Sequence, residues 1–241
     1  MTELVDSPTP PPRPAPEPRS SPRRAERSPW PVAIAVSVVG ALILGAAVLV
    51  QRSDAGGIDA ADSGWAGTVL SIEQTMPDVV LTDTQGQPFD LRAGADGRVT
   101  LLMFGYTNCP DICPISVATL ASALRSLPPA VADGVRLVFV TADPGRDTPE
   151  RLRSFLDQFD EDFIGLHGTV EQLDTAQRAA NVPPAVRDEP DEEGNYAVGH
   201  ATQMIAYQPD GVAGIVYPFG TREGDWVNDL PRLVAGERPS L

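Results

Sequence analysis

The chain has 241 residues, which is enough for one domain of ordinary size with additional segments. Its 33 acidic residues outnumber its 18 basic residues, all of them arginine, and the formal net charge is −15 at pH 7. Phosphate backbones repel so acidic a chain, and we therefore expect no nucleic-acid partner. The charge is uneven, because residues 1–29 hold five arginines against four acids and residues 30–50 hold no charge at all.

The first predicted segment, residues 1–29, is a cytoplasmic tail rich in proline and arginine. It shows no apolar pattern, cannot bury enough surface to offset the entropy of ordering, and should be disordered. Residues 51–64, QRSDAGGIDAADSG, are typical of a flexible linker. The globular domain is predicted to occupy residues 65–241.

Residues 30–50, WPVAIAVSVVGALILGAAVLV, are predicted to form a transmembrane anchor. The 21 residues are uncharged and mostly aliphatic, and a helix needs about 20 apolar residues to cross the hydrocarbon core. Four arginines precede this span closely and only Arg52 follows it, so the positive-inside rule places the C-terminal domain outside the cytoplasm. A cleaved secretory signal is the alternative, but the long polar region before the span favours an uncleaved anchor. We therefore expect a single-pass protein of the cell membrane.

The domain shows the pattern of an α/β fold. The first predicted elements are two strands around a turn at Gly86, a buried strand at 98–104 and a helix at 113–127. The apolar face of this helix is expected to hold Ile115, Ala118, Leu120, Ala121 and Leu124. A second buried strand at 135–143, helices at 149–158 and 169–180, a hairpin at 202–220 that turns at Asp210-Gly211, and a final helix from near Gly224 follow. This order predicts a thioredoxin-like fold with an N-terminal β extension.

Both cysteines of the chain, Cys109 and Cys113, lie in FGYTNCPDICP, where a predicted strand ends and a helix begins. Open α/β sheets carry their sites at this edge. With Pro110 as the first helical residue, Cys109 lies at the helix start, where the helix dipole favours a thiolate. Residues four apart share one helical face, so both sulfurs can point at a single spot. The pair is therefore predicted to serve either redox exchange or metal binding.

The spacing separates these two uses only in part. Thioredoxin-type oxidoreductases have two residues between their cysteines, whereas this chain has three. Two thiolates are soft donors that suit Cu(I) and also zinc. A further ligand is needed, and His200, which precedes a predicted strand, is a better candidate than His167, which we place in a loop. The acidic segment 188–194 is predicted to be a solvated, mobile loop that would let His200 move onto the metal.

A second motif, TADPGRDTP at residues 141–149, follows the second buried strand. Asp147 or Thr148 should cap the helix that begins at the following proline. Asp143 lies on the same sheet edge as the cysteines and could be an outer-shell or partner-facing carboxylate. Met103 and Met204 are soft donors, but their apolar strand contexts predict core positions.

FGYTNCPDICP, TADPGRDTP and the later GHATQMIAYQPDG together resemble the Sco/SenC family over about residues 65–235. The resemblance implies a membrane-tethered, thioredoxin-fold copper chaperone that assembles the dinuclear copper centre of cytochrome c oxidase subunit II. It further implies that Cys109, Cys113 and His200 bind the copper ion. This sequence departs from the family at Gly199, where an Asp is common, and at Asn108, where a His is common.

The resemblance leaves two functions to compare. As a chaperone, the protein would need a thioredoxin-like reductant as a partner, because the exported cysteine pair is liable to oxidise and a disulfide cannot hold the metal in the same way. As a thiol-disulfide oxidoreductase, the pair Cys109 and Cys113 would keep the cysteines of subunit II reduced for metallation. The role of His200 distinguishes the two functions, because copper binding needs this residue whereas thiol exchange needs only the two sulfurs. A peroxidase is a third, weaker interpretation, since the motif shows no peroxide pocket.

Overall fold

The computed structural model describes residues 64–239, which belong to one compact unit of the chain. The predicted tail and anchor lie outside the described residues, as does the predicted linker except for its last residue, Gly64. Between residues 64 and 239, no helix combines the length and apolar character that a membrane span requires. The anchor therefore stays a prediction from the sequence.

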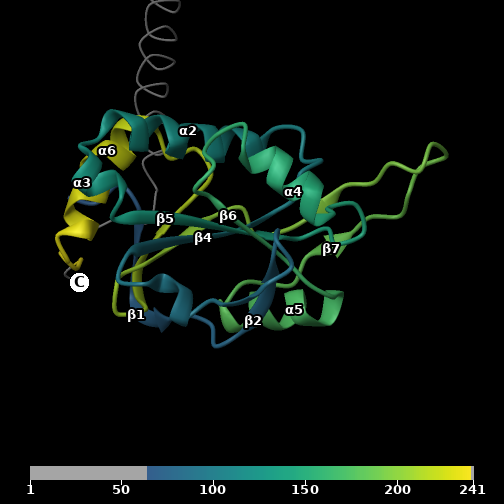
Figure 1. The fold of residues 1–241 in the computed structure, drawn as a ribbon, viewed down its shortest axis with the longest axis horizontal. Coiled ribbons are helices and arrows are strands. Elements are labelled where there is room, and N and C mark those ends of the chain that lie inside the picture. The colour runs from purple at the N-terminus through teal and green to yellow at the C-terminus, as the bar shows by residue number, and fades with distance from the viewer. Residues whose placement is uncertain (1–63, 240–241) are drawn as a thin grey trace, which may run out of the picture. The chain divides into compact units, whose positions relative to one another are not determined.

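The domain is built on one eight-stranded mixed sheet, whose strands run in the order β1-β10-β9-β4-β5-β6-β2-β3 (Figure 1). Its strands are β1 (Thr68–Thr75), β2 (Val80–Asp83), β3 (Pro88–Asp90), β4 (Val99–Gly105), β5 (Val135–Thr141), β6 (Ile164–His167), β9 (Met204–Tyr207) and β10 (Val212–Tyr217). The central strand β4 pairs in parallel with β5 and antiparallel with β9. The ends of β4 and β5 therefore meet at one edge of the sheet.

Helices cover both faces of this sheet. One face carries α2 (Ile112–Ser126), α3 (Pro129–Ala132), α4 (Pro149–Leu156) and α6 (Glu223–Val234), whereas the other carries α5 (Val170–Ala179); a short 3-10 helix, η1 (Ala93–Ala95), follows β3. All seven residues of β4 are buried. Leu101 and Met103 pack into the core beneath α2, and Leu102 and Phe104 into the core beneath α5. The predicted central strand covered on both faces is confirmed.

Most predicted elements are present, but β1, β6, α3, η1 and two short strands at residues 186–187 and 198–199 were not predicted. The exposed Ile72 in β1 interrupts any simple alternation, and β6 has only four residues, so neither shows a readable period. His167 accordingly ends β6 and does not lie in a loop. Ile115, predicted to face the core, is 51% exposed, because α2 instead turns Cys113, Val117 and Leu120 toward the sheet.

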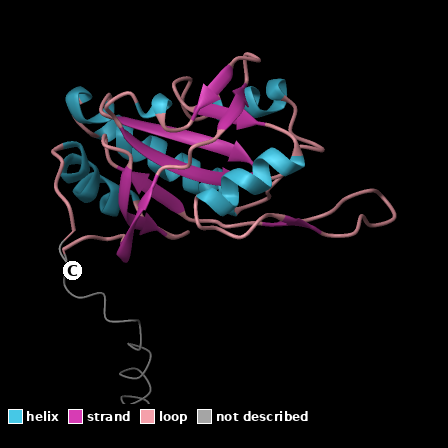
Figure 2. Ribbon diagram, turned by 90° about the horizontal axis from the view of Figure 1, so that it is seen from below, coloured by secondary structure: helices cyan, strands magenta, loops and turns pink. Residues whose placement is uncertain are grey.

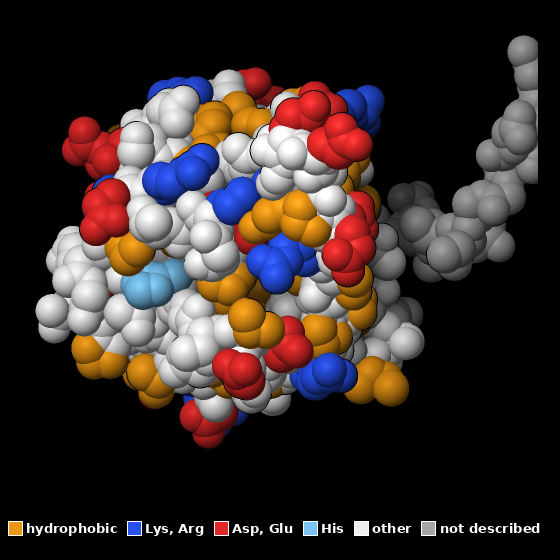
Figure 3. Space-filling view, turned by 90° about the vertical axis from the view of Figure 1, so that its right-hand side faces the viewer, with side chains coloured by type: hydrophobic (Ala, Val, Ile, Leu, Met, Phe, Trp, Pro, Cys, Tyr) orange, Lys and Arg blue, Asp and Glu red, His pale blue; other side chains and the backbone are white. Residues whose placement is uncertain are grey.

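A second, two-stranded sheet lies outside the main one. Its strands β7 (Val186–Arg187) and β8 (Val198–Gly199) pair antiparallel with each other and form the base of a hairpin arm, residues 186–199. Figures 1 and 2 show the arm extending from the body of the domain. The predicted acidic loop 188–194 lies in the exposed tip of this arm, residues 188–195. On the side shown in Figure 3, acidic, basic and apolar side chains are interspersed, and a histidine side chain reaches the surface.

Candidate metal centre

The cysteine loop, residues 106–111, connects the end of β4 to α2. The backbone N–H of Cys109 donates to the carbonyl of Tyr106 at 3.2 Å and closes a turn. Asp111 has a non-helical backbone (φ −135°), so the helix begins only at the next residue. The expectation that Cys109 and Pro110 begin the helix is therefore wrong. Cys109 precedes the helix, and Cys113 is its second residue.

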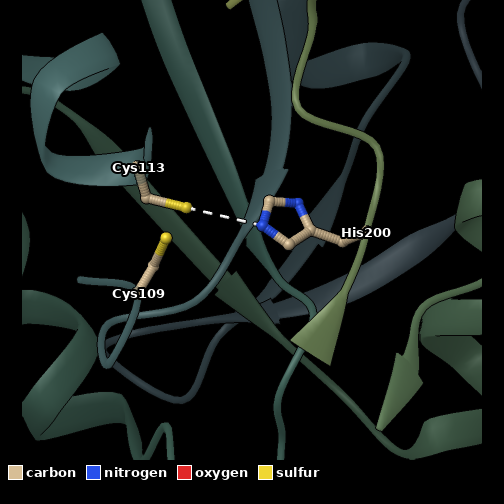
Figure 4. A group of neighbouring side chains, drawn as sticks. All are labelled: Cys109, Cys113 and His200. Carbon is tan, nitrogen blue, oxygen red and sulfur yellow. Dashed lines mark hydrogen bonds between the residues drawn. The ribbon is translucent and has the colours of Figure 1, made fainter. Parts of the chain in front are cut away.

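The two sulfurs nevertheless lie close together, and His200 joins them (Figure 4). The Sγ atom of Cys113 lies 3.7 Å from Nε2 of His200, and one ligand atom from each of Cys109, Cys113 and His200 lies within 4.8 Å of the others. Cys113 is fully buried, Cys109 is 9% exposed and His200 is half-buried. His167 lies on β6 and is not part of this group. The structure thus brings together the three predicted residues and leaves out the weaker candidate.

Gly105 makes room for this site at the end of β4. A Cβ atom there would lie 2.6 Å from Cζ of Phe139 and 2.9 Å from Sγ of Cys113. Both distances are far below ordinary van der Waals contact. Only glycine therefore lets the buried sulfur approach the strand end.

Asp147 holds the cysteine loop against the sheet. Its buried carboxylate accepts hydrogen bonds from the N–H of Thr107 at 3.0 Å, from Oγ1 of Thr107 at 2.6 Å and from Oγ1 of Thr141 at 2.7 Å. Burial raises the pKa of this carboxyl, and the hydrogen bonds from the two threonines partly offset that effect. The capping role belongs to Thr148, whose side chain accepts from the N–H of Arg151 at 3.3 Å. Sequence reasoning missed the loop-anchoring role, since nothing local to Asp147 points to a partner 40 residues away.

The thiol of Cys113 is shielded from water. Burial raises its pKa, and the neighbouring Cys109 adds to the rise, while a hydrogen bond from the backbone N–H of Tyr106 works in the opposite direction. In the metal-free protein Cys113 is therefore a protonated thiol. Because metals bind the thiolate, a metal ion must displace this proton.

The imidazole of His200 is oriented by the backbone. Its Nδ1 atom lies 2.8 Å from the carbonyl oxygen of Ala201, which can only accept, so Nδ1 is the hydrogen-bond donor and Nε2 is the ring nitrogen that faces Cys113. Gly199 supplies no side chain here. The outer contact that a carboxylate gives many metal-bound histidines is thus made by a carbonyl in this chain.

The other candidate residues do not belong to the group of three donors. Asp143 is 2% exposed and is bonded to Arg146 and Tyr196, so it does not face a partner. Met103 and Met204 are 0% and 3% exposed and lie opposite each other in the pairing of β4 with β9. Their predicted core positions are confirmed.

Two thiols and a neutral imidazole form a three-donor site with a definite metal preference. Structural zinc sites are closed by four ligands, and among the described residues this group offers three. Soft sulfur donors select Cu(I), and adding an imidazole suits copper in either oxidation state. The fold and the site together define a thioredoxin-like domain built to hold a single soft metal ion.

Comparison with known proteins identifies the family. The family model described as SCO1/SenC matches residues 70–235, and the chain belongs to this family. A protein of Stutzerimonas stutzeri whose name calls it copper-binding is 37% identical over 145 residues, which cover 59% of this chain and 69% of that protein. The mouse mitochondrial SCO2 homologue is 36% identical over 162 residues, and the chain covers 62% of it, less than two thirds of its length.

Solved structures agree with this assignment. Apo Sco1 from Thermus thermophilus matches with a TM-score of 0.64 and 30% identity, over 72% of this chain and 99% of that one. Yeast Sco1 with copper bound matches with a TM-score of 0.62 and 26% identity, over 69% of this chain and 91% of that one. The predicted thioredoxin-like Sco fold is confirmed, and copper is the metal ion of this domain.

Proposed function

We propose that this protein is a copper chaperone that binds one copper ion through Cys109, Cys113 and His200 and delivers it to the dinuclear copper centre of cytochrome c oxidase subunit II. The observation that carries the proposal is the convergence of these three donors within 4.8 Å. Sco proteins are cytochrome c oxidase assembly proteins, which supports the oxidase as the acceptor. The copper ion is cargo in this proposal.

The three donor residues contribute differently to the binding and release of copper, because they differ in their exposure to solvent. The buried sulfur of Cys113 excludes water from one side of the ion, while Cys109 and His200 lie nearer to solvent. Binding displaces the thiol protons, and the contact between Nδ1 and the carbonyl of Ala201 leaves Nε2 of His200 to face the ion. Transfer then exchanges these ligands, one at a time, for those of the acceptor.

We also propose that residues 30–50 anchor the chain in the cell membrane, with residues 51–241 outside the cytoplasm. The uncharged 21-residue span and the arginines before it support this arrangement. Protease added to intact spheroplasts should remove the domain and leave the N-terminal tail protected. A mature protein shorter than the precursor would instead indicate a cleaved signal.

A thioredoxin-like reductant is part of the same proposal. The two sulfurs lie near each other outside the reducing cytoplasm, where cysteine pairs oxidise. The closeness of the sulfurs also supports the second candidate function, a thiol-disulfide oxidoreductase acting on the cysteines of subunit II. That function requires Cys109 and Cys113 but gives His200 no role.

The discriminating experiment replaces each histidine in turn. The full chain carrying His200→Ala should lose tight binding of one copper ion and fail to restore cytochrome c oxidase activity in cells that lack the wild-type gene, while its thiol exchange rate stays unchanged. The matched control, His167→Ala, should bind copper and restore the oxidase. Normal oxidase assembly with His200→Ala would favour the oxidoreductase.

A further inference from the structure

The third donor, His200, belongs to a segment that the main sheet does not hold. It directly follows the hairpin arm, whose two short strands pair with each other and not with the eight-stranded sheet. The tip of the arm, residues 188–195, is exposed and extends away from the body of the domain (Figures 1 and 2). The position of the imidazole therefore depends on contacts at the base of the arm.

Tyr196 joins the arm to the body of the domain. Its hydroxyl donates a 2.9 Å hydrogen bond to Oδ1 of Asp143, which lies two residues after β5 and is 2% exposed. The other carboxylate oxygen, Oδ2, accepts from Nε of Arg146 in a close ion pair. The backbone N–H of Asp143 donates in turn to Oγ1 of Thr141, at the end of β5, at 3.0 Å. The carboxylate that receives Tyr196 is thus fixed to the central sheet.

Arg146 packs against the same tyrosine. Its guanidinium carbon lies 3.6 Å from the centroid of the Tyr196 ring and 5.7 Å from that of the Tyr106 ring. A cation over an aromatic ring is attracted by the ring's quadrupole, more strongly where water is excluded. The Nη2 atom of Arg146 is buried and has no hydrogen-bond partner among the described residues. The ring contacts and the ion pair therefore hold the guanidinium where it lies.

Tyr106 connects this cluster to the metal centre. Its ring meets the ring of His200 edge-on, with centroids 5.5 Å apart and planes at 89°. Val198, two residues before His200, is 6% exposed and packs in the same core cluster as Tyr106 and the two cysteines. The segment from Tyr196 to His200 is thus fastened at its start by Asp143 and further along by Tyr106.

We propose that Asp143, Arg146 and Tyr196 form a latch that positions the imidazole of His200 on the copper ion. The proposal rests on the copper-binding function proposed above. Asp143 and Arg146 belong to the body of the domain and Tyr196 belongs to the arm, so the latch is the joint between them. With the latch open, the ion is held by the two sulfurs alone and its third position is free for a ligand of the acceptor. The latch therefore sets both the affinity for copper and the rate of transfer.

The test removes one hydroxyl from the latch. Tyr196→Phe in the full chain loses the hydrogen bond to Asp143 but keeps the ring under Arg146. Cu(I) affinity, measured by competition with a chromophoric chelator, should fall about tenfold, which is the scale for loss of an outer contact to a metal ligand. Copper transfer to the chelator should accelerate, and nitrogen coupling in the EPR spectrum of the Cu(II) form should weaken. The matched control is Tyr207→Phe, because the hydroxyl of Tyr207 is buried without a partner among the described residues, and this variant should behave as wild type.

A double-mutant comparison shows whether the latch acts through the imidazole. In a His200→Ala background, adding Tyr196→Phe should change copper affinity no further, because the positioned group is already gone. A further tenfold loss in that background would overturn the latch, as would wild-type affinity in the single variant. Arg146→Gln provides a second test, since it removes the ion pair with Asp143 and the nearer of the two cations over the Tyr196 ring, the other being Arg187 at 5.1 Å, and it should act in the same direction. Failure of the wild-type chain to bind copper would instead contradict the proposed function, and the latch with it.

The metal-free protein offers an independent measurement. Hydrogen–deuterium exchange across residues 196–200 should be faster in Tyr196→Phe than in wild type, because the arm has lost its fastening. Tyr207→Phe should leave the exchange of this segment unchanged. Equal exchange in all three proteins would show that Tyr196 does not hold the arm.

Discussion

The metal centre draws its donors from two regions that are built in different ways. The cysteine loop is buried, begins at a strand end where only glycine fits, and is tied to the sheet by the carboxylate of Asp147. The segment with His200 follows an exposed hairpin and is held mainly by side chains at its base. The pair of sulfurs is thus fixed to the central sheet, whereas the position of the third donor depends on side-chain contacts at the base of the arm. Such a division suits a carrier, which must capture an ion and later give it up.

The largest expected effect is the difference in Cu(I) affinity between variants that lose a sulfur and the variant that loses the imidazole. Cys109→Ser and Cys113→Ser each remove a soft donor and should lower Cu(I) affinity by more than His200→Ala does, because Cu(I) prefers thiolate to imidazole. We expect each cysteine variant to lose more Cu(I) affinity than the about 10–100-fold that is lost when an outer contact to a metal ligand is removed. Chelator competition on all three variants measures the order. An equal loss of Cu(I) affinity in all three variants would contradict the distinction between the sulfur pair and the third donor.

Two glycines, one from each region, should differ in how much their replacement by alanine lowers the free energy of unfolding. Gly105→Ala forces a Cβ against Phe139 and the sulfur of Cys113, and it should cost about 1–3 kcal/mol of the free energy of unfolding as overpacking. Gly199→Ala, in the arm, places its Cβ 3.7 Å from the carbonyl oxygen of Val186, which is an ordinary contact. It should leave stability within about 0.5 kcal/mol of wild type. Urea unfolding of both variants provides the measurement, and a neutral Gly105→Ala would falsify the tight packing inferred for the cysteine loop.

A third comparison uses one carboxylate from each region. Asp147→Ala leaves the donors of Thr107 and Thr141 without their buried acceptor and should cost about 1–3 kcal/mol in unfolding free energy. Asp191→Ala removes an acceptor for Asn195 at the exposed tip of the arm, where water can replace it, and should cost less than about 0.5 kcal/mol. The same unfolding experiment measures both. Similar losses would mean that the two regions are equally rigid.

The smallest expected effect is a dependence of stability on pH. Because burial raises the pKa of Asp147 in the folded state, the folded protein binds this proton more tightly than the unfolded chain does. The resulting stability is fully present below the ordinary carboxyl pKa, near about 4, and is lost as pH rises through the raised value. The stability of wild type relative to Asp147→Asn should therefore fall as pH rises from about 4 toward neutrality. A difference that grows with pH would show that the three hydrogen bonds outweigh burial.

Local patterns in the sequence were sufficient to predict much of the fold of this protein and the residues of its metal centre. The unbroken apolar run of β4 predicts a strand covered on both faces, since alternate side chains of a buried strand enter two cores. The chemical types of Cys109, Cys113 and His200 limit the metal to a soft ion before any geometry is known. These properties depend on residue type and short spacing, and both can be read directly from the sequence.

Tertiary structure alone decided how these residues meet. His200 reaches Cys113 across 87 residues, and Asp147 reaches Thr107 across 40, through the pairing of strands and the fold of the arm. The cysteines converge through a turn before the helix rather than along one helical face, and α2 rotates so that Ile115 faces outward. Periodicity records how a segment alternates but not which part of the chain packs against it. The donors were therefore determined by the sequence, whereas their meeting point depended on the packing of the whole domain.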